Sequence, residues 1–331
     1  MSRGTRVVDV HNHFYPPAYL EALRTGPSAV RVTTGPGGDP LLHYPGDYNV
    51  AVRGHRDIAY RQEVLEREGV DTQVLTLTTP GTHVETPARA AELARLVNDA
   101  FAEIVTERAP RFAALAILPL NDPRAAAAEL ARAVEELGLP GAMLFSNVEG
   151  VPLADERFEP LYEAADALGA VLYIHPTAPI GVEAMTEHWL MPLVGFPFDT
   201  TLAAAHLVFA GIPDRHPKIR WILGHLGGAI PYLAERLDRG YHAFRECRQH
   251  TARPPSETLR TWYYDTVNFD PKALKLALDF AGPDRLLAGS DYPHQIGSIP
   301  KMLESLETLD LPEADRQAII GGNAARLLGL G

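Results

Sequence analysis

The chain has 331 residues, a formal net charge of −12 and 46% hydrophobic residues. This composition is typical of a folded globular protein with a large core and excludes a mostly disordered chain. The excess of acidic residues argues against nucleic acids and anionic membrane surfaces as partners, because like charges repel. The length is enough for one complete (β/α)8 barrel, which takes about 250 residues, or for two smaller domains.

The start of the sequence, MSRGTRVVDVHNH, leads from two arginines into a short apolar run, without the apolar core and cleavage site of a secretory signal. No uninterrupted apolar stretch reaches the roughly 18 residues that a membrane span needs. We therefore expect a cytoplasmic protein. The single cysteine, Cys247, cannot form an intrachain disulfide, and we expect it to pack on a helix.

Eight short apolar runs recur along the chain, each followed by a longer stretch with apolar residues at helical spacing. Alternating strands and helices predict a parallel sheet, and eight such units favour a closed (β/α)8 barrel that forms one domain over residues 1–331. Two longer stretches, residues 26–54 and 176–198, follow strands and are expected to lie over the carboxyl ends of the barrel strands. The predicted strands are residues 7–10, 73–77, 112–118, 141–145, 171–175, 219–225, 262–266 and 286–291.

Four of the predicted strands end in histidine or aspartate. His11 and His13 close the first strand, and their spacing of two places both side chains on one face. The fifth, sixth and eighth strands end in His175, His225 and Asp291. Each residue alone is compatible with a hydrogen-bonded core histidine or a helix-capping aspartate. Their shared position at the ends of parallel strands favours a metal site.

Three segments, DVHNHFYPP, LGHLGGAIPYLAERLD and LLAGSDYP, resemble the amidohydrolase superfamily, and more closely its branch of 2-amino-3-carboxymuconate-6-semialdehyde, 6-methylsalicylate and γ-resorcylate decarboxylases. The resemblance extends over nearly the whole chain. It implies one divalent metal ion, zinc in the first place and manganese as the alternative, bound by His11, His13, His175 and Asp291. It also implies that His225, beside the metal, is a catalytic residue.

Binuclear members of this superfamily often bridge their two metals with a carboxylated lysine at the end of the fourth strand. This chain has no lysine before Lys218, and its fourth predicted strand ends in Phe145, Ser146 and Asn147. We therefore expect a mononuclear site, which leaves His225 available as an acid or a base.

Two arginines are candidates for binding substrate carboxylates, since a guanidinium pairs with a carboxylate through two hydrogen bonds. The resemblance implies this role for Arg53 and, across a dimer interface, for Arg236, with surface ion pairs as the alternative. The candidates for the wall of an aromatic substrate pocket, which ordinary packing would equally explain, are Phe14, Trp189, Phe196 and Phe198.

We predict non-oxidative decarboxylation of a small aromatic or unsaturated carboxylic acid, with Asp291 or a metal-bound water supplying the proton. His225 is expected to polarise the substrate or to manage the proton of the water. A hydrolase or hydratase that acts on a lactone, an amide or an activated double bond from the same site is the first alternative, because fold does not fix function. A catalytically silent metal-binding scaffold is the second. The expected assembly is a homodimer or a dimer-based oligomer, and no organic cofactor is expected.

The remaining histidines are expected at the surface or in support of the site. His294 stands out among them because it closely follows Asp291. The nine residues are His43, His55, His83, His188, His206, His216, His242, His250 and His294.

Overall fold

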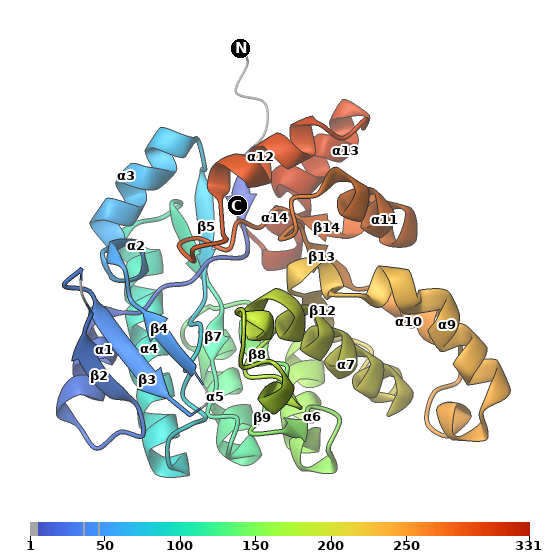
Figure 1. The fold of residues 1–331 in the computed structure, drawn as a ribbon, viewed down its shortest axis with the longest axis horizontal. Coiled ribbons are helices and arrows are strands. Elements are labelled where there is room, and N and C mark those ends of the chain that lie inside the picture. The colour runs from blue at the N-terminus through green and yellow to red at the C-terminus, as the bar shows by residue number, and fades with distance from the viewer. Residues whose placement is uncertain (1–5, 36, 46) are drawn as a thin grey trace.

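The computed structural model describes residues 6–35, 37–45 and 47–331, and in this part parallel strands alternate with helices (Figure 1). Each of the eight predicted runs overlaps with a strand, and residues 141–145 and 171–175 match to the residue. The parallel strands are β1 (Val8–Asp9), β5 (Thr72–Leu75), β6 (Phe112–Ala114), β7 (Ala116–Ile117), β8 (Gly141–Phe145), β11 (Val171–His175), β12 (Arg220–Leu223), β13 (Tyr263–Asp265) and β14 (Leu286–Leu287).

The strands form two parallel sheets, with the orders β1-β5-β6 and β14-β13-β12-β11-β8-β7. The two sheets are joined at both pairs of edges. Leu115 is the single residue between β6 and β7, so the chain itself connects one pair. At the other pair Val10, just after β1, donates its N–H to the carbonyl of Ala288, just after β14 (2.9 Å). Because neighbouring strands are parallel and follow one another in register, their carboxyl ends gather on one side of the fold.

Helices follow the strands and pack against them, and local sequence explains their limits. The side chain of Asp57 accepts the N–H of Tyr60 at the start of α3, Asp122 caps α5 in the same way, and Gly69 ends α3 in the left-handed conformation that glycine adopts without strain. The main helices are α3 (Ile58–Glu68), α4 (Pro87–Glu107), α5 (Pro123–Glu135), α6 (Glu159–Leu168), α7 (Phe196–Phe209), α9 (Ile230–Ala243), α11 (Pro271–Ala281), α12 (Ile299–Glu307) and α14 (Asn323–Leu328).

Shorter elements complete the fold. The helices are α1 (Pro17–Thr25), α2 (Arg53–Arg56), α8 (Ile212–Arg215), α10 (Pro255–Leu259) and α13 (Glu313–Gln317), and β9 (Asn147–Val148) pairs antiparallel with β10 (Val151–Pro152).

The stretch 26–54, apart from residues 36 and 46, forms an antiparallel sheet of three strands beside α1 (Figure 1), a sheet that the sequence did not predict. Its hydrogen bonds place it next to the carboxyl ends of the parallel strands. Tyr44 donates to the hydroxyl of Thr79 (2.9 Å), and Asn49 donates to the hydroxyl of Tyr15 (2.8 Å). The strands are β2 (Arg31–Thr34), β3 (Pro40–Tyr44) and β4 (Asp47–Val50).

The stretch 176–198 contains one 3-10 turn and a π-helix, Met191–Gly195, that continues into α7. By length and composition alone, Met191–Phe209 would be apolar enough to cross a membrane, although 44% of this window is buried inside the protein. Asp199 lies within it and accepts a hydrogen bond from the side chain of Asn147 (2.8 Å). This buried polar contact indicates a helix that packs on the rest of the fold.

Candidate metal centre

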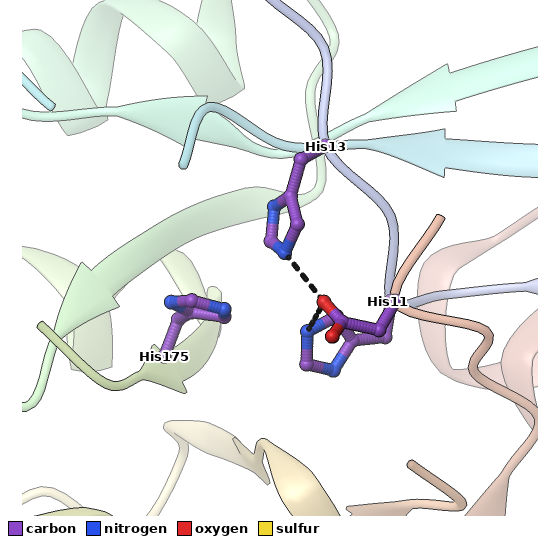
Figure 2. Close-up of side chains that lie close together, drawn as sticks. His11, His13 and His175 are labelled. Carbon is purple, nitrogen blue, oxygen red and sulfur yellow. Dashed lines mark ion pairs between the residues drawn. The ribbon is translucent and has the colours of Figure 1, made fainter. Parts of the chain in front are cut away.

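Three histidines and one aspartate converge at the carboxyl ends of the strands. His11 and His13 follow β1, His175 ends β11, and Asp291 follows β14. The nitrogen or oxygen atoms that these four side chains can offer a metal all lie within 4.8 Å of one another. Figure 2 shows the imidazoles of His11, His13 and His175 directed toward a common space. The structure thus brings together the four residues that the sequence predicts as ligands.

The four candidate ligand atoms lack ordinary hydrogen bonds in the part of the chain that the structure describes. Nε2 of His11, His13 and His175 and Oδ1 of Asp291 are all buried without a hydrogen-bond partner. Asp291 Oδ1 lies 3.4 Å from His11 Nε2 and 3.3 Å from His13 Nε2, beyond the usual range for such bonds. Buried polar atoms without partners are costly, and a divalent metal bound by three nitrogens and one oxygen would satisfy all four.

The second ring nitrogen of each imidazole, Nδ1, contacts a polar group of the protein. His11 Nδ1 lies 2.7 Å from Asp265 Oδ2, His13 Nδ1 lies 3.1 Å from the Thr76 hydroxyl, and His175 Nδ1 lies 2.7 Å from the carbonyl of Pro176. The carbonyl can only accept, so His175 carries its proton on Nδ1 and leaves Nε2 free. Such supporting contacts set the orientation of the rings and the basicity of the ligands.

Charge in the centre favours binding of a cation. Burial opposes ionisation of Asp291, but the nearby imidazoles of His11, His13 and His294 outweigh it and hold the pKa of this carboxyl well below its usual value. Burial also opposes a proton on His11, yet the carboxylates of Asp265 and Asp291 raise the pKa of this imidazole to about 10. The metal-free site therefore keeps a proton on His11 at neutral pH, in the place where a metal ion would carry the positive charge.

Metal binding should therefore strengthen as pH rises. The ion must displace the His11 proton, and because the pKa of His11 is raised, this competition continues from neutral pH up to about 10. We expect the dissociation constant of zinc to fall about tenfold per pH unit between pH 7 and 9, measured by competition with a chelator of known proton affinity. In Asp265→Asn the loss of the adjacent carboxylate should flatten this dependence, and an equally steep dependence in the variant would contradict the assignment.

Asp265 is a site residue that the sequence analysis missed. It ends β13, is fully buried, and accepts hydrogen bonds from the Tyr173 hydroxyl (2.6 Å) and the backbone N–H of His225 (3.1 Å) in addition to its contact with His11. One carboxylate thus fixes both a candidate metal ligand and the turn that carries His225. The signal was present, because an acidic residue at the end of a predicted buried strand needs a polar partner.

Arg61 on α3 is a second residue that was missed. Its side chain is fully buried, and it donates hydrogen bonds to the side chains of Asn12 (2.8 Å) and Gln73 (2.9 Å) and to the backbone carbonyl of His13. Gln73 in turn donates to Asp9 (2.7 Å). This network immobilises the segment between the first two candidate ligands, which explains why asparagine suits the position between two histidines.

A glycine and an unusual backbone angle position Asp291 after the last strand, and His225 after β12 adopts a similar angle. A Cβ atom at Gly289 would lie 2.8 Å from the Cβ of His11, so only glycine lets β14 and the first histidine approach this closely. Asp291 and His225 adopt the left-handed conformation, with φ of 58° and 50°. Such angles are strained for residues other than glycine and are often found at functional sites.

His225 lies beside the four candidate ligands in a turn after β12. The centre of its ring is 4.8 Å from that of His11 and 5.5 Å from that of His175, and its Nδ1 is buried without a hydrogen-bond partner among the described residues. Burial lowers the pKa of His225 to about 4, so the imidazole is neutral at pH 7. Together with Asp291 it lines an open cavity of about 670 Å³. Its catalytic role remains a prediction.

The residues at the end of the fourth predicted strand, which directly follow Phe145 of β8, have a structural role. The side chains of Ser146 and Asn147 both donate hydrogen bonds to Asp199 of α7. Among the described residues, one group of histidine and acidic side chains has the spacing of a metal site, and it contains neither of them. The arrangement is therefore that of a single metal ion.

The residues predicted to bind the substrate differ in how far their side chains are exposed. The exposed side chain of Arg53 pairs with Asp57 (2.9 Å), and Arg236 is exposed on α9. Phe14 is completely buried and lies 5.3 Å from the guanidinium of Arg61. Trp189 is 59% exposed. The roles of these four in substrate binding stay predictions.

Some of the remaining histidines are not at the surface. His55, His83 and His216 are only 1%, 4% and 7% exposed, so of the two expected positions, at the surface or in support of the site, the surface position does not apply to them. His216 pairs with Glu159 (2.8 Å), whereas His55 packs near the ring of His294. The residues that bury these histidines come from distant segments of the chain, so the spacing of residues along the sequence does not predict their burial.

A parallel α/β fold with three histidines and one aspartate at its strand ends defines a protein with a single site for a divalent metal. The amidohydrolase family model matches residues 8–330, and the chain belongs to this family.

The chain is similar to several named decarboxylases. The chain is 34% identical over 274 residues to 2-amino-3-carboxymuconate-6-semialdehyde decarboxylase of Dictyostelium discoideum, covering 82% of this chain and 76% of that protein. The structure of 5-carboxyvanillate decarboxylase from Sphingomonas paucimobilis is similar with a TM-score of 0.87 and 27% identity, over 99% of this chain and 100% of the other. The structure of a dihydroxybenzoic acid decarboxylase from a Polaromonas species, with bound manganese and the inhibitor 2-nitroresorcinol, is similar with a TM-score of 0.81 and 26% identity, over 98% and 97% of the two chains.

Proposed function

We propose that the chain is a metal-dependent, non-oxidative decarboxylase of a small aromatic or unsaturated carboxylic acid. The observation that carries this proposal is the group of four buried ligand atoms next to His225, on a cavity of about 670 Å³, in a chain similar to several decarboxylases. The hydrolase alternative is not favoured, because the named relatives act on acids by removing carbon dioxide.

The same proposal includes a closed (β/α)8 barrel in one domain. The continuous chain from β6 to β7 and the hydrogen bond between Val10 and Ala288 support closure, and a family match over residues 8–330 supports a single domain. In barrels of this kind the carboxyl ends of the strands carry the active site, which is where the candidate ligands lie.

When bound, the metal supplies positive charge that holds and polarises the substrate carboxylate. His11, His13, His175 and Asp291 would hold the ion. Zinc is the proposed metal because the donor set of three nitrogens and one oxygen is typical of zinc. Manganese is the alternative, since the similar Polaromonas enzyme contains it.

Side chains of the protein then transfer the proton to the substrate. The pKa of Asp291 lies well below its usual value, so its side chain is a carboxylate. We assign to Asp291 the uptake of a proton from solvent and the delivery of that proton to the ring carbon that bears the carboxylate, with the ring supplying the electron pair of the new C–H bond. The bond to the carboxylate then breaks, its electron pair returns to the ring, and carbon dioxide leaves. His225, neutral at pH 7, donates a hydrogen bond that polarises the substrate.

Turnover of a panel of acids tests this proposal. Zinc- and manganese-loaded protein would be incubated with hydroxybenzoates, carboxyvanillate and unsaturated dicarboxylates, and carbon dioxide release would be measured together with the decarboxylated product. Lactones and amides serve as the control panel for hydrolysis. Hydrolysis of a control compound without carbon dioxide release from any acid would contradict the proposal.

We also propose a homodimer in which Arg236 binds the substrate of the partner subunit. Arg236 is exposed on α9, and the same helix exposes 77% of Tyr232, with 59% of Phe244 exposed at its end. Exposed aromatic side chains and arginine are enriched at protein–protein interfaces. An isologous dimer would bring each Arg236 to a second copy without any further sequence feature.

Hybrid dimers test this arrangement. Subunits with Arg236→Ala and subunits with His225→Asn should each be nearly inactive alone. Mixing them should restore activity at one of the two hybrid sites, since that site receives both intact residues. Mixed dimers, verified by native mass spectrometry, that stay as inactive as their parents would show that Arg236 does not act across the interface.

A further inference from the structure

Phe269, in the loop between β13 and α11, has a backbone conformation that a bulky residue rarely adopts. Its φ angle is 65°, in the left-handed region, where a phenylalanine is a genuine outlier. Such strain persists only where the surrounding structure enforces it, and it occurs most often where proteins bind ligands or carry out chemistry. His225 and Asp291, which share this conformation, line the same cavity as Phe269. The strained backbone therefore indicates a role for Phe269 beyond ordinary packing.

Hydrogen bonds hold the loop that carries Phe269 at both of its ends. At the first end the side chain of Asp265, which supports a candidate metal ligand, accepts the backbone N–H of Val267 (2.9 Å). At the second end the side chain of Asp270 accepts the backbone N–H of Lys272 (2.7 Å) and so begins α11. Phe269 lies between these two fixed points. The carboxylate that supports the metal centre thus also sets the position of Phe269.

The side chain of Phe269 is half-buried and forms part of the wall of the cavity of about 670 Å³ that His225 and Asp291 also line. Among the described residues, it supplies the one phenyl ring of this wall. Two further apolar side chains of the wall, Leu193 and Ile296, are 53% and 60% exposed. Large apolar side chains left exposed around a cavity are typical of a surface that a ligand covers. The cavity thus offers an apolar wall with one aromatic ring in it.

A phenyl ring in such a wall discriminates between flat and puckered ligands. An aromatic ligand packs against it in an offset-stacked or edge-to-face arrangement, which adds to the burial of apolar surface, whereas a saturated ring gains the burial alone. Because Phe269 and the candidate ligand Asp291 line one cavity, an acid whose carboxylate is held at the metal centre can direct its ring toward Phe269.

We propose that Phe269 is a specificity-determining residue, whose ring packs against the ring of the substrate acid and makes the cavity prefer flat, conjugated rings to saturated ones. This inference rests on the proposed function and deepens it by naming the residue that selects the ring. The fixed loop keeps the phenyl group in the cavity wall, and the left-handed backbone at Phe269 is the conformation that this placement requires.

The test uses metal-loaded protein with two probes, benzoate and cyclohexanecarboxylate, which carry the same carboxylate on a flat and on a puckered ring. Binding is measured by calorimetry. We expect wild type to bind benzoate at least about fivefold more tightly, and Phe269→Leu, which keeps an apolar side chain but removes the aromatic ring, to reduce this preference to within about twofold. Phe269→Tyr retains the ring and should retain the preference. Phe209→Leu, a change in a half-buried phenylalanine of α7 outside the cavity wall, is the matched control and should also keep it.

Metal content and circular dichroism establish that each variant is loaded and folded. If Phe269→Leu does not fold, Phe269→Asn takes its place, because asparagine removes the ring and tolerates the left-handed conformation. A preference that survives removal of the ring overturns the proposal, as does a preference lost in Phe269→Tyr or equal or absent binding of both probes to wild type. A preference that depends on Phe269, without carbon dioxide release from any acid, would refute the decarboxylase and keep this role. Carbon dioxide release from aromatic acids, with a preference that does not depend on Phe269, would do the reverse.

Discussion

Chelation of the metal should abolish turnover and lower the unfolding temperature, and adding back zinc or manganese should restore both. The physical reason is the set of four buried atoms that have no hydrogen-bond partner in the described structure: Nε2 of three histidines and Oδ1 of Asp291. An ion that binds only the folded chain stabilises it by mass action, by about 2.7 kcal/mol when free metal is about 100 times its dissociation constant.

The measurement pairs elemental analysis with thermal unfolding and activity on the same sample. His13→Asn is the control, because a chain that has lost one ligand should bind little metal and should gain little further instability from the chelator. Full activity in protein that elemental analysis shows to be metal-free would contradict the proposal that turnover requires a metal.

The parts of the fold that could be predicted from the sequence are those in which local pattern and burial agree. GAMLF and VLYIH are continuous apolar runs because both faces of β8 and β11 are buried, and both strands have the predicted limits. The three strands of the 26–54 stretch are partly exposed and interrupted by glycine and proline, so their pattern is weak. Their pairing depends on contacts with one another, which no local window contains.

The candidate ligands were predictable for a similar reason. His11, His13 and His175 stand at the ends of buried strands, where an imidazole needs a partner, and a shared edge of the fold brings them together. Asp265 stands in an equivalent place on β13, but its partner is the ring of another predicted residue rather than a metal. Arg61 lies on a helix, where an arginine is normally a surface residue, and its burial depends on how α3 packs against β1 and β5.

His225→Asn should lower turnover by about 10²- to 10⁴-fold while one metal ion per chain is retained, because the imidazole handles a proton or polarises the substrate and is not one of the four clustered ligands. Asparagine is the suitable replacement. His225 has a φ of 50°, and asparagine tolerates this left-handed conformation better than most residues. The backbone N–H that donates to Asp265 is also kept, so the turn after β12 should persist.

The experiment compares kcat, KM and metal content of wild type, His225→Asn and His216→Asn. His216 is another buried histidine, but its partner is Glu159 rather than the metal centre, so its replacement should affect stability and leave kcat nearly unchanged. Neutral His225 sits beside His11 and His175 with an unpaired nitrogen, and the loss should therefore appear in kcat of the loaded enzyme. Metal lost in step with activity would instead make His225 a ligand, and the centre would then have to be rebuilt around five residues.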